Sequence, residues 1–297
     1  MENNIYLFEY SDKKWCFDVC SNKIFELSIL SFKILSENNN DIKQYMKMLL
    51  KFYTLQEIFD ALNEIKKLKS LGYICENVSE FVVYDYTNLF NIDIVYFDIY
   101  TELVEKTVKK LVSDGFNIHL KENILKEQKQ VVQQNVSNTD IEFLIEQLDI
   151  FLKNWSDKCN FQFFTIYLKI IDIVYQYENK LICQLKEHIQ KYPYLYKYFC
   201  IVTKSEKNLF PCRAGLNTLY ITEDGQLKIC FKHLHQLKKI SGKIANYRCS
   251  VYEKPMCNSC WSKFICGGYC EFNKEETEKG CIIFKSVVQI LIKLTLS

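Results

Sequence analysis

The spacing of seven cysteines near the C-terminus is the sequence feature that most constrains this chain. They form two patterns, Cys212-x12-Gly225-x4-Cys230 and Cys257-x2-Cys260-x5-Cys266-x3-Cys270, with Cys281 following the second. A C-x2-C turn aims two thiolates at one metal, because two intervening residues let the chain reverse while backbone amides point at the sulfurs. Four thiolates complete either a zinc site or an iron–sulfur cluster, so ligand identity alone leaves both open.

The cysteine count also bears on the cellular compartment. The chain has 14 Cys in 297 residues, more than buried packing thiols require. Its first residues, MENNIYLFEY, lack the basic and then apolar regions of a secretory signal. We therefore expect a reducing cytoplasmic environment, in which disulfides are an improbable use for these cysteines.

Charge and hydropathy limit the partners. The formal net charge of +2 gives no global basic field, so we do not expect nucleic acid as a partner. The segment 201–256 is locally basic, which indicates a solvated surface or a docking face for an acidic peptide. The apolar tail 282–296 is interrupted by Lys285 and Lys293, which favours an amphipathic terminal helix and no membrane span.

The N-terminal part reads as three strands followed by three helices. Aromatic and β-branched runs predict strands at 5–10, 14–19 and 24–27, and helical spacing predicts helices near 28–35, 42–50 and 55–68. Thr54-x-x-Glu57 is a capping box at the start of the third helix, and Gly72 can end it in the left-handed conformation. This order suggests a winged-helix-like domain over residues 1–79.

The middle of the chain is less clearly patterned. A strand at 92–99, a helix at 101–113 and a strand at 116–120 predict one βαβ unit with parallel strands. Residues 126–138 are polar and read as a linker or a solvated helix, and Thr139-x-x-Glu142 opens another capped helix. We expect an α+β fold with a second segment over residues 80–200.

The cysteine region resembles a known family. Its spacing, and KPMCNSCWSKFICGGYC in particular, is similar to the SPASM domain, the twin-cluster C-terminal extension of radical SAM peptide maturases, and especially those of six-cysteine peptides. The resemblance implies a SPASM-like domain over 201–297 with two [4Fe-4S] clusters, one held by Cys257, Cys260, Cys266 and Cys281 and the other by Cys212, Cys230 and Cys270. Cys200 or Cys249 would be a possible fourth ligand to the second cluster; otherwise one iron is open to substrate. Structural zinc and a decayed site stay open as alternatives.

The N-terminal segments resemble the winged-helix RiPP recognition element of the same maturases. In that element, the leader of a precursor peptide adds to the third strand and packs on the third helix. The resemblance implies leader-peptide contacts at Lys23, Ile24, Phe25 and Glu26 of the strand and at Ile58 and Leu62 of the helix. The middle of the chain more weakly resembles a part of the barrel of these maturases, namely a truncated βα remnant followed by a helical bridge.

Two features of a radical SAM enzyme are missing. The motif C-x3-C-x2-C is absent: Cys16-x3-Cys20 comes near it, but position 23 is Lys, and the pair falls in the expected N-terminal hairpin. The Gly-Gly-Glu loop that binds SAM is absent as well. We therefore expect no SAM, assign no catalytic residue, and do not expect an independent radical SAM enzyme.

The preferred hypothesis is an accessory component of a peptide maturation system. It would bind a leader peptide and carry auxiliary clusters while a separate radical SAM maturase generates the radical. One alternative is an active SPASM-type enzyme in which the open iron binds substrate, or in which an unrecognised site cleaves SAM. The other is a zinc-stabilised protein-interaction module.

Overall fold

The computed structural model describes residues 5–37, 42–74, 94–97, 99–114, 116–122, 140–156, 172–204, 218–228, 230, 251, 254–268 and 274–297. These residues combine helices with two small sheets, which confirms the α+β class. The expected linker at 126–138 and the capping residue Thr139 lie outside the described residues.

The first sheet contains the three strands expected near the N-terminus. Strands β1 (Ile5–Tyr10), β2 (Lys13–Asp18) and β3 (Lys23–Leu27) pair antiparallel in the order β1-β2-β3. Ser11 and Asp12 both have positive φ, as the two central residues of a tight hairpin turn with right-handed twist require. Successive side chains alternate between the two faces of this sheet.

Three helices follow: α1 (Ile29–Ser36), α2 (Ile42–Leu49) and α3 (Leu55–Ser70). The expected capping box at α3 is confirmed, because the Thr54 hydroxyl accepts from the Glu57 amide while the Glu57 carboxylate accepts from the Thr54 amide. Gly72 follows α3 with φ of +68°, also as expected. The helices enclose a small apolar cluster, whose buried members are Leu30, Tyr45, Leu49, Ile58 and Ala61.

The second sheet has the order β5-β4-β6-β7. Strand β4 (Ile94–Phe97), helix α4 (Glu102–Ser113) and strand β5 (His119–Glu122) form the expected βαβ unit, and β4 and β5 are parallel. Strand β6 (Thr218–Ile221) pairs parallel with the other side of β4, and β7 (Leu227–Lys228) pairs antiparallel with β6. A strand from the cysteine-rich part of the chain therefore completes the sheet of the middle part.

The largest core lies among four helices, α5 (Ile141–Ser156), α7 (Glu178–His188), α8 (Pro193–Lys204) and α11 (Lys274–Leu294). A short 3-10 turn, η4 (Ile189–Lys191), connects α7 to α8. The Asp149 carboxylate of α5 accepts from the amides of Tyr194 and Leu195, each at 2.8 Å, and so satisfies the exposed amides at the start of α8. The terminal helix begins at Lys274, earlier than the expected 282.

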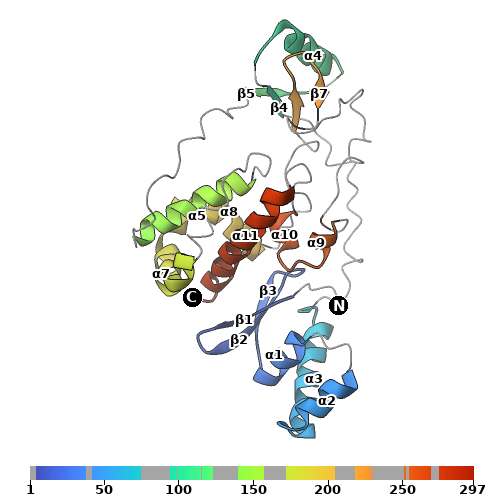
Figure 1. Ribbon diagram of the computed structural model, residues 1–297, viewed down its shortest axis with the longest axis vertical. Coiled ribbons are helices and arrows are strands. Elements are labelled where there is room, and N and C mark those ends of the chain that lie inside the picture. Colours follow the sequence, from blue (N-terminus) through green and yellow to red (C-terminus); the bar gives the residue numbers. More distant parts are fainter. Residues whose placement is uncertain are drawn as a thin grey trace.

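The N-terminal sheet shares this helical core. Phe8 and Phe17 project from one face of the sheet and belong to the same buried cluster as residues of α5, α7, α8 and α11. On the same face, the Tyr6 ring stacks on the Trp261 ring with centroids 4.2 Å apart. Figure 1 shows the consequence: the sheet lies between α1–α3 at one end of the molecule and the helical body, while α4 and its sheet lie at the other end.

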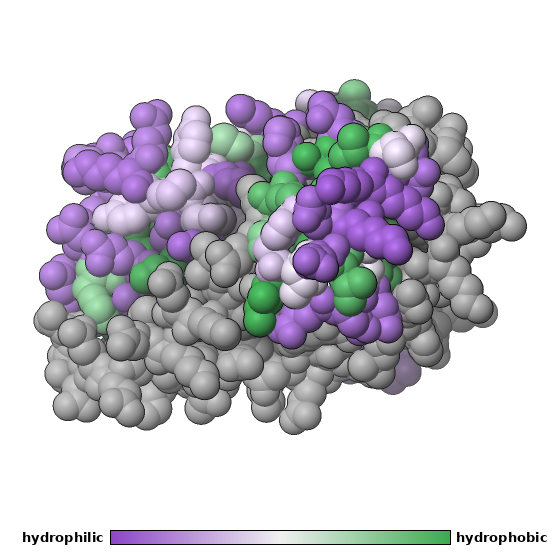
Figure 2. Space-filling view, turned by 90° about the horizontal axis from the view of Figure 1, so that it is seen from above, coloured by the Kyte–Doolittle hydropathy of each residue, from purple (hydrophilic) through white to green (hydrophobic). Residues whose placement is uncertain are grey.

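The face around α4 is mixed in polarity. Seen from above in Figure 2, the coloured residues show apolar side chains beside hydrophilic ones. The exposed apolar residues of this unit are Ile99, Tyr100, Leu103, Val112 and Leu120. Within the described ranges, no helix combines the length and the apolarity that a bilayer crossing requires.

Candidate functional site

The C-x2-C segment forms two short helical turns, α9 (Pro255–Asn258) and α10 (Lys263–Cys266). The amides of Cys257 and Asn258 both donate to the Lys254 carbonyl, at 2.9 and 2.8 Å, and the Cys260 amide donates to the Cys257 carbonyl at 2.9 Å. These three hydrogen bonds stabilise a reversal of the chain between Cys257 and Cys260. The chain therefore turns at this point as expected, but these amides bond to carbonyls instead of pointing at the sulfurs.

Two glycines bring two of the thiols to one place. Gly267 and Gly268 follow α10 with φ of +77° and +87°, a region that L side chains rarely adopt. The Cys266 thiol donates to the Gly268 carbonyl at 3.7 Å, and a Cβ at Gly268 would lie 3.4 Å from Cys257 Sγ. Cys257 and Cys266, both buried, thus border the same glycine.

The other predicted ligands are placed less fully. Cys260 is half-buried with its Sγ 3.3 Å from Ser262 Oγ, and Cys281 is half-buried in α11. Among the residues that the structure describes, no three His, Cys, Asp or Glu side chains gather as a metal site. Ligation of one metal by Cys257, Cys260, Cys266 and Cys281 therefore stays a prediction.

The second set of ligands is mostly outside the described residues. Cys212, Cys249 and Cys270 are not described, while Cys230 is buried just after β7. Cys200 lies half-buried on α8, a helix that packs against α10.

The surroundings of the thiols suit an anionic metal centre. Cys257 and Cys266 belong to the apolar helical core. Tyr198 in the same core is 3% exposed, and burial, with a smaller contribution from Cys266, raises the pKa of its phenol. Two lysines of the same segment, Lys254 and Lys263, are only 2% and 1% exposed. Buried thiols in an apolar core fit either a [4Fe-4S] cluster or zinc.

The predicted peptide-binding strand has an open edge. Within the described residues β3 pairs only with β2, so its outer amides and carbonyls are available to another strand. Lys23 and Phe25 point to the same face, where the Phe25 ring stacks on Tyr73 at 5.9 Å and Lys23 Nζ lies 4.3 Å from the Tyr73 ring centroid. Sequence reasoning missed Tyr73, which lies only three residues beyond α3.

The other two residues predicted on this strand point to the opposite face. Ile24 packs against the helical core, and Glu26 forms an ion pair with Lys13 at 2.6 Å. Direct contact with a peptide side chain is thus better suited to Lys23 and Phe25 than to Ile24.

The two predicted positions on α3 differ in exposure. Ile58 is 1% exposed and lies inside the cluster between α1, α2 and α3, so it supports the helix instead of facing a ligand. Leu62 is 42% exposed. Leu55 and Phe59 are exposed on the same helix face as Leu62, since they precede it by seven and three residues. This second apolar stripe at helical spacing was the sequence signal for an exposed face.

Cys16 and Cys20 are packing thiols. Both are buried, and Cys16 lies within β2 directly opposite Phe25. Burial, reinforced by the Asp18 carboxylate, raises the pKa of the Cys16 thiol far above its ordinary value. A protonated thiol inside a sheet is unsuited to metal ligation.

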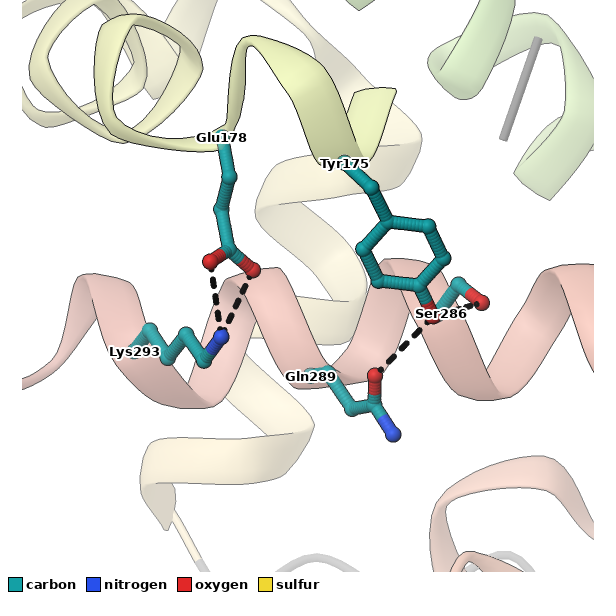
Figure 3. A network of polar contacts seen from close by, with 5 residues as sticks. All are labelled: Tyr175, Glu178, Ser286, Gln289 and Lys293. Atoms are coloured by element: carbon teal, nitrogen blue, oxygen red, sulfur yellow. Dashed lines mark hydrogen bonds and ion pairs between the residues drawn. The ribbon is translucent and has the colours of Figure 1, made fainter. Parts of the chain in front are cut away.

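Polar contacts join Tyr175 and Glu178 to the terminal helix α11. Figure 3 shows Tyr175 bonded to Ser286 at 2.7 Å and to Gln289 at 3.3 Å, and Lys293 paired with both carboxylate oxygens of Glu178 at 2.7 Å. Burial raises the pKa of the nearby Tyr6 phenol, which also bonds to Gln289. Tyr6 therefore connects β1 to α11 and, through its ring, to Trp261 beside Cys260.

Comparison with known proteins gives no matching family model and no similar curated protein.

Proposed function

We propose that this chain is an accessory component of a peptide maturation system, which binds the leader of a precursor peptide at β3 and carries thiolate-bound [4Fe-4S] clusters in its C-terminal part. A separate radical SAM maturase would generate the radical. On this proposal residues 1–79 form a winged-helix-like recognition unit, residues 80–200 with β4, α4 and β5 are the remnant of a barrel and its helical bridge, and residues 201–297 are SPASM-like.

One observation carries the proposal: strand β1 of the sheet that contains β3 contacts the residue that follows the C-x2-C turn. Tyr6 of β1 stacks on Trp261, which follows Cys260 in sequence. A peptide added to β3 would extend the same sheet at the edge opposite to β1, the strand that contacts Trp261. This arrangement supports a protein that joins a peptide-binding sheet to the thiol segment through one shared core.

The edge of β3 offers two kinds of recognition. Its backbone can supply main-chain hydrogen bonds to an extended peptide, which give affinity without sequence preference. Lys23, Phe25 and Tyr73 form a basic and aromatic surface next to that edge. An extended peptide with acidic and apolar residues is the partner that this surface fits.

Metal analysis of the full chain tests the cluster part. We expect anaerobically purified protein to contain about eight iron and eight sulfide per chain, the content of two [4Fe-4S] clusters. Cys257→Ser should lose about half of both, because it removes one ligand of one cluster. Cys183→Ser is the matched control, since Cys183 is an exposed thiol on α7. Zinc without sulfide would refute the cluster assignment and favour the zinc-stabilised interaction module.

Peptide binding is tested separately. Peptides selected from a random displayed library against the full chain should bind more weakly to Phe25→Ala and Lys23→Ala, whereas Lys66→Ala on the exposed side of α3 should bind as the wild type does. Backbone N-methylation of a selected peptide at alternate residues should also weaken binding, because it removes strand hydrogen bonds. Selected peptides that bind both strand variants with unchanged affinity would contradict the assignment of β3.

A further inference from the structure

Helix α3 carries an exposed apolar stripe. Leu55, Phe59 and Leu62 are 71%, 58% and 42% exposed, although each is a large apolar side chain. They are four and three residues apart, and exposed Lys66 follows four residues later, so all of these side chains lie along one face of the helix. Single apolar residues on a surface are common, whereas a contiguous apolar face is typical of an interaction site. We call these four residues the α3 stripe.

The α3 stripe faces away from the end of β3. The Glu64 carboxylate of α3 accepts from the Ser28 amide at 3.2 Å and from the Ser31 hydroxyl at 2.5 Å. Ser28 directly follows β3, so Glu64 lies on the side of α3 that contacts this strand end. Each residue turns an α-helix by about 100°, which places Glu64 about 180° from Leu55 and about 160° from Leu62. The stripe is therefore a surface separate from the open edge of β3.

The charges of α3 are divided between its two sides. Its acidic residues, Glu57, Asp60 and Glu64, lie about 130–170° round the helix from the middle of the stripe. Each already has a partner, since Glu57 completes the capping box and Asp60 accepts from Gln56 at 2.8 Å. The stripe itself is apolar in its N-terminal half and ends on Lys66. Its charge is therefore complementary to that of an acidic partner.

We propose that the α3 stripe binds one amphipathic helix of a partner protein, with apolar side chains against Leu55, Phe59 and Leu62 and an acidic side chain beside Lys66. Alternating steps of four and three residues form the seam along which two helices pack. Acidic residues are favourable near the N-terminus of a helix, so an antiparallel helix with acidic residues in its first turns fits best. The family resemblance implied Leu62 as a leader contact; on this inference it contacts the partner helix instead.

A second copy of this chain fits the stripe less well. In an antiparallel pair of α3 helices, the lysine of each stripe would lie on the apolar half of the other, and in a parallel pair Lys66 would lie against Lys66. Neither arrangement brings an acidic residue of α3 to Lys66, because those residues lie on the other side of the helix. A different protein is therefore the better occupant. The inference requires neither a bound cluster nor a peptide at β3.

Selection of helices against the full chain tests the proposal. The probe is a displayed library of monomeric helical peptides that are randomised along one face. We expect the selected peptides to carry apolar residues at helical spacing and Asp or Glu in the N-terminal half. Their affinity, measured by fluorescence anisotropy, should fall about tenfold or more for Phe59→Ser and for Lys66→Glu, because both side chains lie in the proposed contact.

Lys67→Glu is the matched control. It makes the same change of charge at an exposed lysine of the same helix, about 100° round from Lys66. It should change the affinity by less than about threefold, because an exposed charge outside the contact is screened by salt. Selected peptides in which Asp and Glu are replaced by Lys should bind the wild type weakly and Lys66→Glu more tightly, a gain that an unfolded variant would not give.

Each outcome decides the matter. Selected helices whose affinity is unchanged by both Phe59→Ser and Lys66→Glu would overturn the inference, and so would a library that yields no binding helix. A dimer of the full chain in sedimentation velocity that is lost in Phe59→Ser would assign the stripe to a second copy and overturn it too. Phe25→Ala at β3 should leave helix binding unchanged, so a failure here leaves the proposed peptide site standing.

Discussion

Replacing Gly225 by alanine tests how the second sheet is built. Gly225 lies in the turn between β6 and β7, with φ of +76°, and its carbonyl accepts from Thr107 of α4 at 2.7 Å. A Cβ at this position would lie 2.8 Å from the Leu103 carbonyl oxygen and 3.1 Å from Leu103 Cβ. The oxygen belongs to the first turn of α4 and cannot move without disturbing that helix.

Two costs add in Gly225→Ala. Alanine in the left-handed region costs about 1–2 kcal/mol, and overpacking against a fixed neighbour costs about 1–3 kcal/mol. The smaller entropy of the unfolded alanine chain returns about 0.4–1 kcal/mol. We therefore expect the unit of β4, β5, β6 and α4 to lose about 2–4 kcal/mol.

The matched control is Gly72→Ala. Gly72 has a similar φ of +68°, but a Cβ there meets nothing within 4 Å, so only the backbone cost remains. Amide hydrogen exchange, read on peptides covering 94–122 and 218–228, should accelerate about 30-fold or more in Gly225→Ala. In Gly72→Ala, the acceleration should be smaller and confined to the end of α3. Equal effects of the two substitutions would refute the argument from close approach.

Three further predictions concern single groups. In native protein, iodoacetamide should modify exposed Cys183 within minutes and Cys16 only after denaturation, because burial raises the pKa of the Cys16 thiol; similar rates by mass spectrometry would contradict this. Tyr6→Phe should reduce the loss of stability above pH ~10 in urea titrations, because the raised pKa of Tyr6 contributes stability that is complete below the unfolded value and declines as pH rises toward the folded one. Lys293→Met should destabilise the protein by about 1–3 kcal/mol, since it leaves the largely buried Glu178 carboxylate without its cation; Glu178→Gln in the same chain should recover part of this in a double-mutant cycle, and strict additivity would refute the coupling.

Local patterns predicted the elements that have local causes. The strands near the N-terminus are short runs rich in aromatic and β-branched residues, with a polar turn between the first two, and the start of α3 carries its own capping box at Thr54 and Glu57. The parallel pairing of β4 and β5 followed from the helix between them. These features are decided within a few residues of the chain.

Pairing and burial between distant segments could not be predicted in this way. Strand β6 (Thr218–Ile221) pairs with β4 (Ile94–Phe97), although the two lie far apart in the sequence. No local pattern specifies such a partner. Helix α3 has two apolar stripes, and spacing alone does not say that Ile58 faces the core while Phe59 faces outward. Lys254 and Lys263 look like surface residues in the sequence, because only the tertiary structure encloses them.

The shared core of β1, β2 and α11 imposes an order on folding during synthesis. Phe8 and Phe17 are made well before α11, whose residues Phe284 and Leu291 belong to the same buried cluster. The nascent hairpin must therefore wait with exposed aromatic side chains, a state that chaperones recognise and that promotes aggregation. Fragments that end before α11 should for this reason be poor expression targets, even when they contain the whole of β1–β3 and α1–α3.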